Sequence, residues 1–404
     1  MASIRPFAAL RPRPDLAARI CELPYDVLST EEARALARGN PLSFLHVSKS
    51  EIDFPPGTDP CQPAVYAKAR ENFQRLIAEG ALRQDPRPAF HLYRQVQGAH
   101  SQVGLVAVAS CEEYETGVIR KHELTRPDKE DDRARHIEAL NAQTGPAFLV
   151  YPARQSLNDL VNAALARPPE IDFVAPDGVR HSAWVVAEPD QIAFIQREFE
   201  QVPRLYIADG HHRSAAAVRV YRSRQGAGQS PWYLNVIFPD DQVRILPYNR
   251  VLKTLNGLSP AQLLERLKEV FEVQSPGEAV PRQPHTLGFY LRKTWHTLRF
   301  RPERVAGQTP ADRLDVSLLQ QHVLEPLFGI ANPRTSDQIS FVGGIRGTAE
   351  LERLVDGGEY ACAFSLFPTR VRDLMAIADA GAIMPPKSTW FEPKLRDAMF
   401  CHLI

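Results

Sequence analysis

The chain has 404 residues, and its 48 basic residues equal its 48 acidic residues, so the formal net charge at pH 7 is zero. This balance argues against a dedicated nucleic-acid-binding protein and predicts no binding to nucleic acid or to an anionic membrane. The hydrophobic content of 44% and the charged content of 24% are ordinary for a globular protein, and 34 prolines predict many turns and short elements. The length predicts two domains or one large domain.

The cysteine pattern and the N-terminus predict where the protein resides. The five cysteines are scattered, with no CxxC pair, which predicts reduced thiols and argues against a zinc ribbon. Arg5 and Pro6 interrupt the N-terminal apolar residues, and no apolar run approaches the ~18 residues of a membrane span. We therefore predict a cytoplasmic protein.

Helices and strands alternate along the first 250 residues, which is typical of an α+β or mixed α/β fold. Ser29 is placed to cap a helix, and Glu32 three residues later completes a capping box. Gln97 and Gly98 predict the turn of a β-hairpin. Strands are predicted at 4–10, 43–47, 89–95, 102–110, 146–151, 171–174, 181–187, 204–208 and 232–238, and helices at 64–79, about 121–142, 156–166, 189–201 and 214–223.

A turn at Asn256 and Gly257 precedes a new amphipathic helix and indicates a boundary near residue 250. We therefore predict a larger core at 1–250 and a smaller C-terminal α/β subdomain at 251–404. In the second part, helices are predicted at 259–271, 316–327 and 369–380, strands at 286–292, 297–301 and 361–367, and a loop at 384–394.

The sharpest candidate site lies where the strand at 204–208 leads into Asp209, Gly210 and the helix beginning with His211. Successive backbone N–H groups at a helix start, together with Arg213, are typical of a phosphate site. The imidazoles of His211 and His212 would donate hydrogen bonds or move protons. Adjacent helix positions diverge, so these two histidines alone do not predict a metal site. In the simpler alternative Asp209 only caps the helix and the histidines are packed polar groups.

Three further segments contain candidate residues. Lys121, His122 and Glu123 open a polar helix, with Glu123 as a general base and Lys121 as an electrostatic clamp, or they form a solvated helix start. The loop Pro385–Phe391 offers Lys387, Ser388 and Thr389 to an anionic ligand, or it is a proline-braced loop anchored by its aromatic rings. Tyr25, Asp26 and His46 would line a substrate pocket, or Asp26 only stabilises its own turn.

Several segments together resemble the domain-of-unknown-function family 1015, almost from end to end and in the right order. The Asp209–Arg213 segment is also similar to the ParB/sulfiredoxin-like superfamily, in which such a turn binds nucleotide phosphates. That superfamily includes a free-serine kinase, so the resemblance implies a ParB/sulfiredoxin-like core and a small-molecule kinase activity. The segments that carry the first resemblance are Ile4–Phe7, Pro24–Val27, Lys121–Thr125, Asp209–Arg213 and Met384–Leu395.

The main functional hypothesis is a nucleotide-dependent phosphotransferase acting on a small hydroxylated metabolite such as serine. Its predicted donor is ATP, ADP or another phosphate donor, with Mg²⁺, and a homo-oligomer is compatible with the sequence. The alternatives are a phosphatase or nucleotide hydrolase that uses the same phosphate cradle, and a non-catalytic nucleotide or phosphometabolite sensor. The predicted roles are catalytic for Glu123, Asp209, His211 and Lys121, phosphate-binding for Gly210, His212, Arg213, Lys387, Ser388 and Thr389, substrate-binding for Tyr25, Asp26, His46 and His122, and metal-binding for Asp209 and Glu123.

Overall fold

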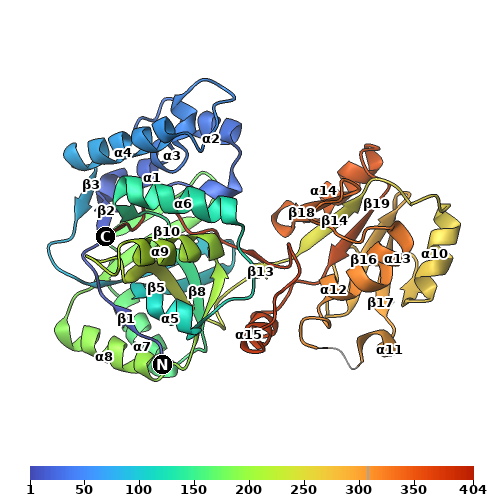
Figure 1. Ribbon diagram of the computed structural model, residues 1–404. Helices are drawn as coiled ribbons and strands as arrows, with labels where there is room; N and C mark the ends of the chain where they lie inside the picture. Colours follow the sequence, from blue (N-terminus) through green and yellow to red (C-terminus); the bar gives the residue numbers. More distant parts are fainter. Residues whose placement is uncertain (307–308) are drawn as a thin grey trace. The chain divides into compact units, whose positions relative to one another are not determined.

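The computed structural model describes residues 1–306 and 309–404, and it divides the chain into two compact units (Figure 1). Unit 1 comprises Met1–Val243 and Pro393–Ile404, and unit 2 comprises Arg244–Glu392. Both units mix helices and strands, as predicted. Among the residues described, no helix combines the length and the apolar character needed to cross a membrane.

This division differs from the predicted one at both ends of unit 2. Strand β14 (Tyr248–Leu252) pairs with β18 (Ile339–Gly343) and β19 (Cys362–Leu366), so unit 2 begins before residue 250. Strand β21 (His402–Leu403) pairs with β7 (Ala142–Gln143), so the C-terminal residues belong to unit 1. Each pairing joins segments far apart in the chain, and composition does not reveal such contacts.

Unit 1 is built on a mixed sheet with the strand order β6-β11-β8-β12-β5-β4-β10-β9, and β1 pairs with β5. All five residues of β8 are buried, and its neighbours are β11, which is antiparallel, and β12, which is parallel. The strands of this sheet are β1 (Ile4–Arg5), β4 (Phe90–Gln97), β5 (His100–Ser110), β6 (Ile119–Arg120), β8 (Ala147–Tyr151), β9 (Ile171–Val174), β10 (Arg180–Val186), β11 (Leu205–Asp209) and β12 (Trp232–Pro239).

Helices of unit 1 bury their apolar sides against this sheet. The largest core cluster joins Ile137 of α6, Phe199 of α8 and Val218 of α9 to strand residues such as Leu149 and Ile207. Helices α6 and α9 lie side by side (Figure 1). The other elements are β2 (Leu10–Pro12), which pairs with β3 (Leu82–Gln84), and the helices α1 (Ala17–Ile20), α2 (Thr30–Ala37), α3 (Leu45–Ser48), α4 (Pro63–Ala78), α5 (Cys111–Thr116), α6 (Pro127–Leu140), α7 (Gln155–Leu165), α8 (Pro189–Glu200) and α9 (His211–Ser223).

Unit 2 has its own sheet, with the strand order β15-β17-β16-β19-β14-β18, and a short pair formed by β13 and β20. Its separate core includes Val251, Tyr290, Leu351 and Ala363. Its remaining elements are β13 (Ile245–Leu246), α10 (Pro260–Lys268), β15 (Phe271–Gln274), β16 (Thr286–Leu291), β17 (Thr294–Phe300), α11 (Pro302–Val305), α12 (Asp315–Leu319), α13 (Glu325–Phe328), α14 (Gly347–Asp356), α15 (Val371–Asp379) and β20 (Trp390–Phe391).

Most predicted elements are present, but four predictions are wrong. The helix predicted at about 121–142 begins only at Pro127, at the start of α6, so Lys121–Glu123 lie in the loop after β6. The predicted strand at 43–47 contains helix α3, because Ser43 accepts a hydrogen bond from the backbone of Leu45 and starts a turn. The strand predicted at 4–10 is interrupted between β1 and β2. The helix predicted at 259–271 ends at Lys268, and the apolar residues that follow it belong to the edge strand β15.

The predicted capping box of α2 is confirmed and provides a test of local stability. Ser29 Oγ accepts from the backbone N–H of Glu32 at 3.1 Å, and Glu32 accepts from the backbone of Ser29 at 2.8 Å. Ser29→Ala removes the cap and is expected to destabilise α2 by about 1 kcal/mol. Hydrogen exchange should become faster in α2. The comparison variant Ser259→Ala removes the same box from α10, so its effect should be confined to α10.

Candidate functional site

Two parallel neighbouring strands, β6 and β11, bring the predicted motifs of unit 1 together. Their register pairs Arg120 with Tyr206, so Lys121–Glu123 and Asp209–His211 both follow the carboxyl ends of these strands. Carboxyl ends of parallel strands lie at the same edge of a sheet. The sheet thereby gathers side chains from two distant segments at the start of helix α9.

The start of α9 is an open donor site for an anion. The N-cap residue Gly210 has φ 88°, in the left-handed region, and a Cβ there would lie 3.2 Å from the backbone of Ala147. No side chain caps the helix, and the backbone N–H groups of His211, His212 and Arg213 have no acceptor in the described parts of the chain. The helix dipole adds positive potential at these three donors.

Asp209, directly before this turn, is an ionised and tightly held carboxylate. Its Oδ2 accepts from Lys394 Nζ at 3.0 Å, and its Oδ1 accepts from the backbone of Gly210 at 2.8 Å. Burial raises the pKa of Asp209, but the charges of Lys394 and Arg213 outweigh burial and hold this pKa well below its usual value. Asp209 and Lys394 therefore form an ion pair beneath the helix start.

Lys394→Met is expected to destabilise unit 1, because it leaves Asp209 with less positive charge nearby. Fully buried pairs lose about 3–5 kcal/mol when one partner is removed; we expect about 2 kcal/mol here because the side chain of Asp209 is 28% exposed. Urea unfolding followed by hydrogen exchange of unit 1 peptides measures this loss. In the matched control Lys68→Met, the lost partner is the exposed Glu71, and the change should stay within about 0.5 kcal/mol. Equal losses in both variants would show that the partly buried pair contributes no more to the stability of unit 1 than an exposed pair does.

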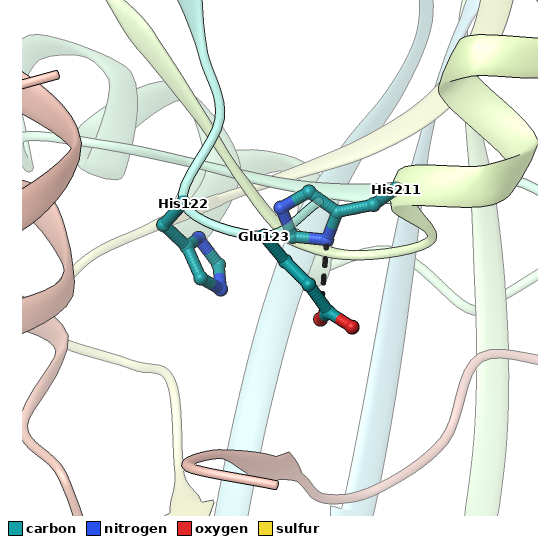
Figure 2. A group of neighbouring side chains, drawn as sticks. All are labelled: His122, Glu123 and His211. Atoms are coloured by element: carbon teal, nitrogen blue, oxygen red, sulfur yellow. Dashed lines mark ion pairs between the residues drawn. The ribbon is translucent and has the colours of Figure 1, made fainter. Parts of the chain in front are cut away.

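Figure 2 shows the second part of the site, where His122 and Glu123 face His211. Glu123 Oε2 lies 3.9 Å from Nδ1 of His211, and the rings of His122 and His211 meet edge to face with centroids 4.4 Å apart. Both histidines are at least nine-tenths buried, whereas the side chain of Glu123 is 47% exposed. Glu123 is therefore the member of this group that a ligand can reach.

Both buried histidines are neutral at neutral pH. Burial lowers the pKa of His122 to about 4, although a hydrogen bond with the backbone of Ile207 raises it. Burial, and then the neighbouring His122, lower the pKa of His211 well below its usual value. One ligand atom from each of His122, Glu123 and His211 lies within 4.8 Å of the other two. Two imidazoles and a carboxylate are donors that suit zinc, manganese or iron.

The predicted residues His212, Tyr25 and Asp26 lie close to this helix start. His212 Nε2 accepts from the backbone N–H of Arg126 at 3.1 Å, so this nitrogen carries no proton. The exposed carboxylate of Asp26 acts electrostatically on both His212 and Arg213. Tyr25 stacks under the guanidinium of Arg133, 3.8 Å from its ring centroid. The fold thus brings the Pro24–Val27 turn to the Asp209 motif.

Arg213 lies inside the protein, so it is less open to a ligand than the sequence suggests. Its side chain is 10% exposed and donates to the carbonyl oxygen of Pro146. It lines a small cavity together with Arg133, Gly145 and Asp397. Burial raises the pKa of Asp397 to about 7, although Arg213 lowers it. The charge of Arg213 therefore supports the helix start from beneath.

The remaining predicted residues either have other partners or belong to unit 2. His46 pairs with Asp53 at 2.6 Å, and the ammonium group of Lys121 lies 4.2 Å from the ring centroid of Tyr114. Lys387 and the two hydroxyl residues after it belong to unit 2. Asp209, predicted as a metal ligand, is not in the group of three possible ligands, because its carboxylate accepts from Lys394 and Gly210.

Three residues of the site have no assigned role in the sequence analysis. Lys394 stands in the C-terminal motif that carries the family resemblance, so its segment is recognisable but its pairing with Asp209 is not. Arg133 lies on α6, after the polar segment that follows Glu123, and its guanidinium group contacts the ring of Tyr25. No sequence pattern around Asp397 indicates a role for it, because the feature that distinguishes this carboxyl is its burial in the folded protein.

Comparison with known proteins gives remote structural likenesses. No curated protein matches the chain. A free serine kinase in complex with AMP is 15% identical, with a TM-score of 0.36 over 71% of this chain and 86% of that one. SbnI of Staphylococcus aureus, truncated at its C-terminus, is 11% identical, with a TM-score of 0.40 over 72% and 85%. A conserved hypothetical protein of Pyrococcus furiosus is 14% identical, with a TM-score of 0.35 over 72% and 93%.

A family match covers most of the chain, and it includes the segments around Glu123 and Asp209 that form the site. The sequence model of the family described as "Protein of unknown function (DUF1015)" matches residues 4–317, and the chain belongs to this family.

Proposed function

We propose that the protein is a nucleotide-dependent phosphotransferase that acts on a small hydroxylated metabolite such as serine, with ATP or ADP as donor. The observation that carries the proposal is the position of Glu123, a half-exposed carboxylate beside the first residue of a helix whose start offers backbone donors to an anion. A phosphoryl acceptor needs a base, and a phosphoryl donor needs a cradle of positive potential. Both lie at the same sheet edge.

The start of α9 would hold the phosphate groups of the donor. The backbone N–H groups of His211, His212 and Arg213 would donate to phosphate oxygens, and the buried charge of Arg213 would strengthen this attraction from beneath. Glycine at position 210 lets the chain turn tightly before these donors. The similarity of Asp209–Arg213 to phosphate-binding turns of ParB/sulfiredoxin-like proteins supports the same assignment, and that fold is part of the proposal.

Glu123 suits the role of general base better than Asp209. A base is effective when its pKa lies near the working pH, and the neighbouring cations hold the pKa of Asp209 far below that range. Glu123 would take the proton from the hydroxyl of the acceptor as its oxygen attacks the phosphorus atom. The bond between that phosphorus and the leaving phosphate oxygen breaks, and the negative charge stays on the shortened nucleotide.

Mg²⁺ is the predicted companion of the nucleotide, but the side chains near Glu123 do not form a site for it. The possible ligand group contains two imidazole nitrogens, whereas Mg²⁺ prefers oxygen ligands. The carboxylate of Asp209 accepts from Lys394 and Gly210 instead. In this proposal Mg²⁺ would therefore be bound by the nucleotide phosphates, and no step depends on it.

Phosphorus-31 NMR of the whole protein tests the proposal. The protein is incubated with ATP or ADP and Mg²⁺, in the presence and absence of serine and other hydroxylated metabolites. We expect a phosphate ester signal that needs both the protein and the acceptor. Release of inorganic phosphate without an acceptor would identify a hydrolase, and binding without turnover would identify a sensor. Either result would overturn the proposal.

A second candidate function, hydrolysis of a phosphate ester, is favoured by the metal-capable group of His122, Glu123 and His211. A transition metal held there would supply an activated water molecule, and the start of α9 would hold the phosphate as before. Metal analysis of the purified protein tests this candidate. A stoichiometric transition metal that is lost in the His211→Ala variant, together with phosphate release, would favour hydrolysis over transfer.

A further inference from the structure

A loop in unit 2, between α15 and β20, has features that its packing within unit 2 does not explain. Two prolines precede Lys387, which has φ 55°, in the left-handed region. Ser388 is buried; its Oγ donates to the carbonyl oxygen of Pro385 at 2.6 Å, and its own carbonyl oxygen accepts from Thr369 at 3.0 Å. The loop is therefore held in one conformation by contacts inside unit 2.

Two backbone donors of this loop lack acceptors. In the described parts of the chain, the N–H groups of Lys387 and Thr389 make no hydrogen bond, whereas the N–H group of Ser388 points to the Pro385 carbonyl oxygen across the turn at Pro386 and Lys387. Unpaired backbone donors are uncommon in and near buried segments because each loses its bond to water. A series of N–H groups next to a left-handed residue forms a concave site that binds anions. The left-handed Lys387, with unpaired N–H groups at its own position and at Thr389, is one feature of such a site.

Positive charge at the same loop is not balanced by an acid. Arg250 is 3% exposed, yet it makes no ion pair in residues 1–306 and 309–404. It donates to the carbonyl oxygens of Tyr248 and Lys387, the latter at 3.2 Å. Burial lowers the pKa of Arg250 to about 9. Its guanidinium also lies 5.0 Å from the ring centroid of Phe341. A buried cation without an acidic partner is costly, and an anion nearby reduces that cost.

Lys387 adds a second cation within reach of the same donors. Its ammonium group lies 5.1 Å from the ring centroid of Tyr248 and 3.5 Å from the Tyr248 hydroxyl oxygen, and it makes no ion pair with any described carboxylate. The carbonyl oxygen of Lys387 accepts from Arg250, so the two cations are linked through one residue. The exposed Lys387 would contact an anion directly, and Arg250 would act as a positioning residue beneath it.

We infer that the loop Pro385–Thr389, supported by Arg250, is an anion-binding site of unit 2 that takes a phosphoryl group. The unpaired backbone donors of Lys387 and Thr389 and the Lys387 ammonium group match a compact oxyanion with several equivalent oxygens. The inference depends on unit 2 alone, and it goes beyond the proposed function because it holds whether or not the protein transfers phosphate. An inorganic phosphate compound or a nucleotide phosphate would satisfy the same chemistry.

Lysine-selective ¹⁵N labelling of the whole protein gives a local readout, because the chain has nine lysines. The Lys387→Gln variant assigns the backbone signal of Lys387 by its disappearance. Pyrophosphate, ADP and adenosine are then added in separate titrations at low salt. We expect pyrophosphate and ADP to shift the Lys387 signal and adenosine to leave it unchanged. A Lys387 signal that neither pyrophosphate nor ADP moves overturns the inference, and a shift with ADP alone excludes inorganic phosphate compounds as the source.

Calorimetry with pyrophosphate supplies the affinity. Lys387→Gln is expected to weaken this binding event about tenfold or more, as the loss of a charge-assisted contact predicts. The matched control is Lys293→Gln, because Lys293 is also exposed, lies in unit 2 and has a left-handed φ of 62°. Arg250→Lys should keep most of the affinity and Arg250→Met should lose it. Equal affinity in the Lys387 and Lys293 variants would overturn the inference, even if transfer itself is confirmed.

Discussion

Glu123→Gln is expected to lower the rate of the proposed phosphoryl transfer by about 10²–10⁴-fold, because the amide cannot take the proton of the attacking hydroxyl. The substitution keeps the size of the side chain and its place beside His211 Nδ1. Nucleotide affinity should change little, since the donors at the start of α9 are backbone groups. Phosphorus-31 NMR measures the rate, and calorimetry with ADP measures the affinity.

The control for this substitution is Glu112→Gln, which changes an exposed carboxylate on α5. We expect wild-type rates from it. Retention of more than about a tenth of the activity in the Glu123 variant would show that another group accepts the proton. A loss of nucleotide affinity equal to the loss of rate would instead place Glu123 in binding.

Asp397 is expected to contribute stability to unit 1 that is lost as the pH rises from about 4 to about 7. Burial raises the pKa of this carboxyl from 3.8 to about 7. The folded protein therefore binds this proton more tightly than the unfolded chain, so the contribution of Asp397 to the free energy of unfolding decreases as the pH increases through this window, opposite in sign to that of the buried histidines His122 and His211. The difference between these pKa values corresponds to on the order of 4 kcal/mol.

Asp397→Asn should remove this pH dependence, because the amide stays neutral. Relative to the wild type, the variant should gain stability between pH 4 and pH 8, by on the order of 4 kcal/mol at most. Urea unfolding at the two pH values, followed by hydrogen exchange of unit 1 peptides, measures the change. Asp190→Asn alters an exposed carboxyl and should leave the profile unchanged. A parallel profile for both variants would contradict the burial argument.

The local structure around the site follows from short sequence patterns. The capping box at Ser29, the hairpin between β4 and β5, and the strand-to-helix turn at Gly210 are all confirmed. Each of these features depends on residues close together in the chain, so local propensity and hydrogen bonding are sufficient to specify it. The wrong prediction at 43–47 is also local, because an apolar run of that length suits a strand or a buried helix equally well.

The partners within the site could not be predicted in this way. The adjacent His211 and His212 do not by themselves indicate a group that could hold a metal. In the structure His211 joins His122 and Glu123, which come from a segment almost ninety residues earlier. The pairing of Asp209 with Lys394 crosses an even longer separation. Side-chain contacts of this kind depend on strand order, which one sequence does not state.

The sequence by itself determined the composition of the site: the strand, the glycine turn, the helix start and the polar segment at Lys121–Glu123. Only the tertiary structure decided which of these groups a ligand can reach. The parallel pairing of β6 with β11 leaves Glu123 half exposed, and it buries Arg213 beneath the turn and His211 against His122. Exposure and charge pairing are properties of packed chains, because burial changes the free energy of every charged group, and residue type alone does not specify them.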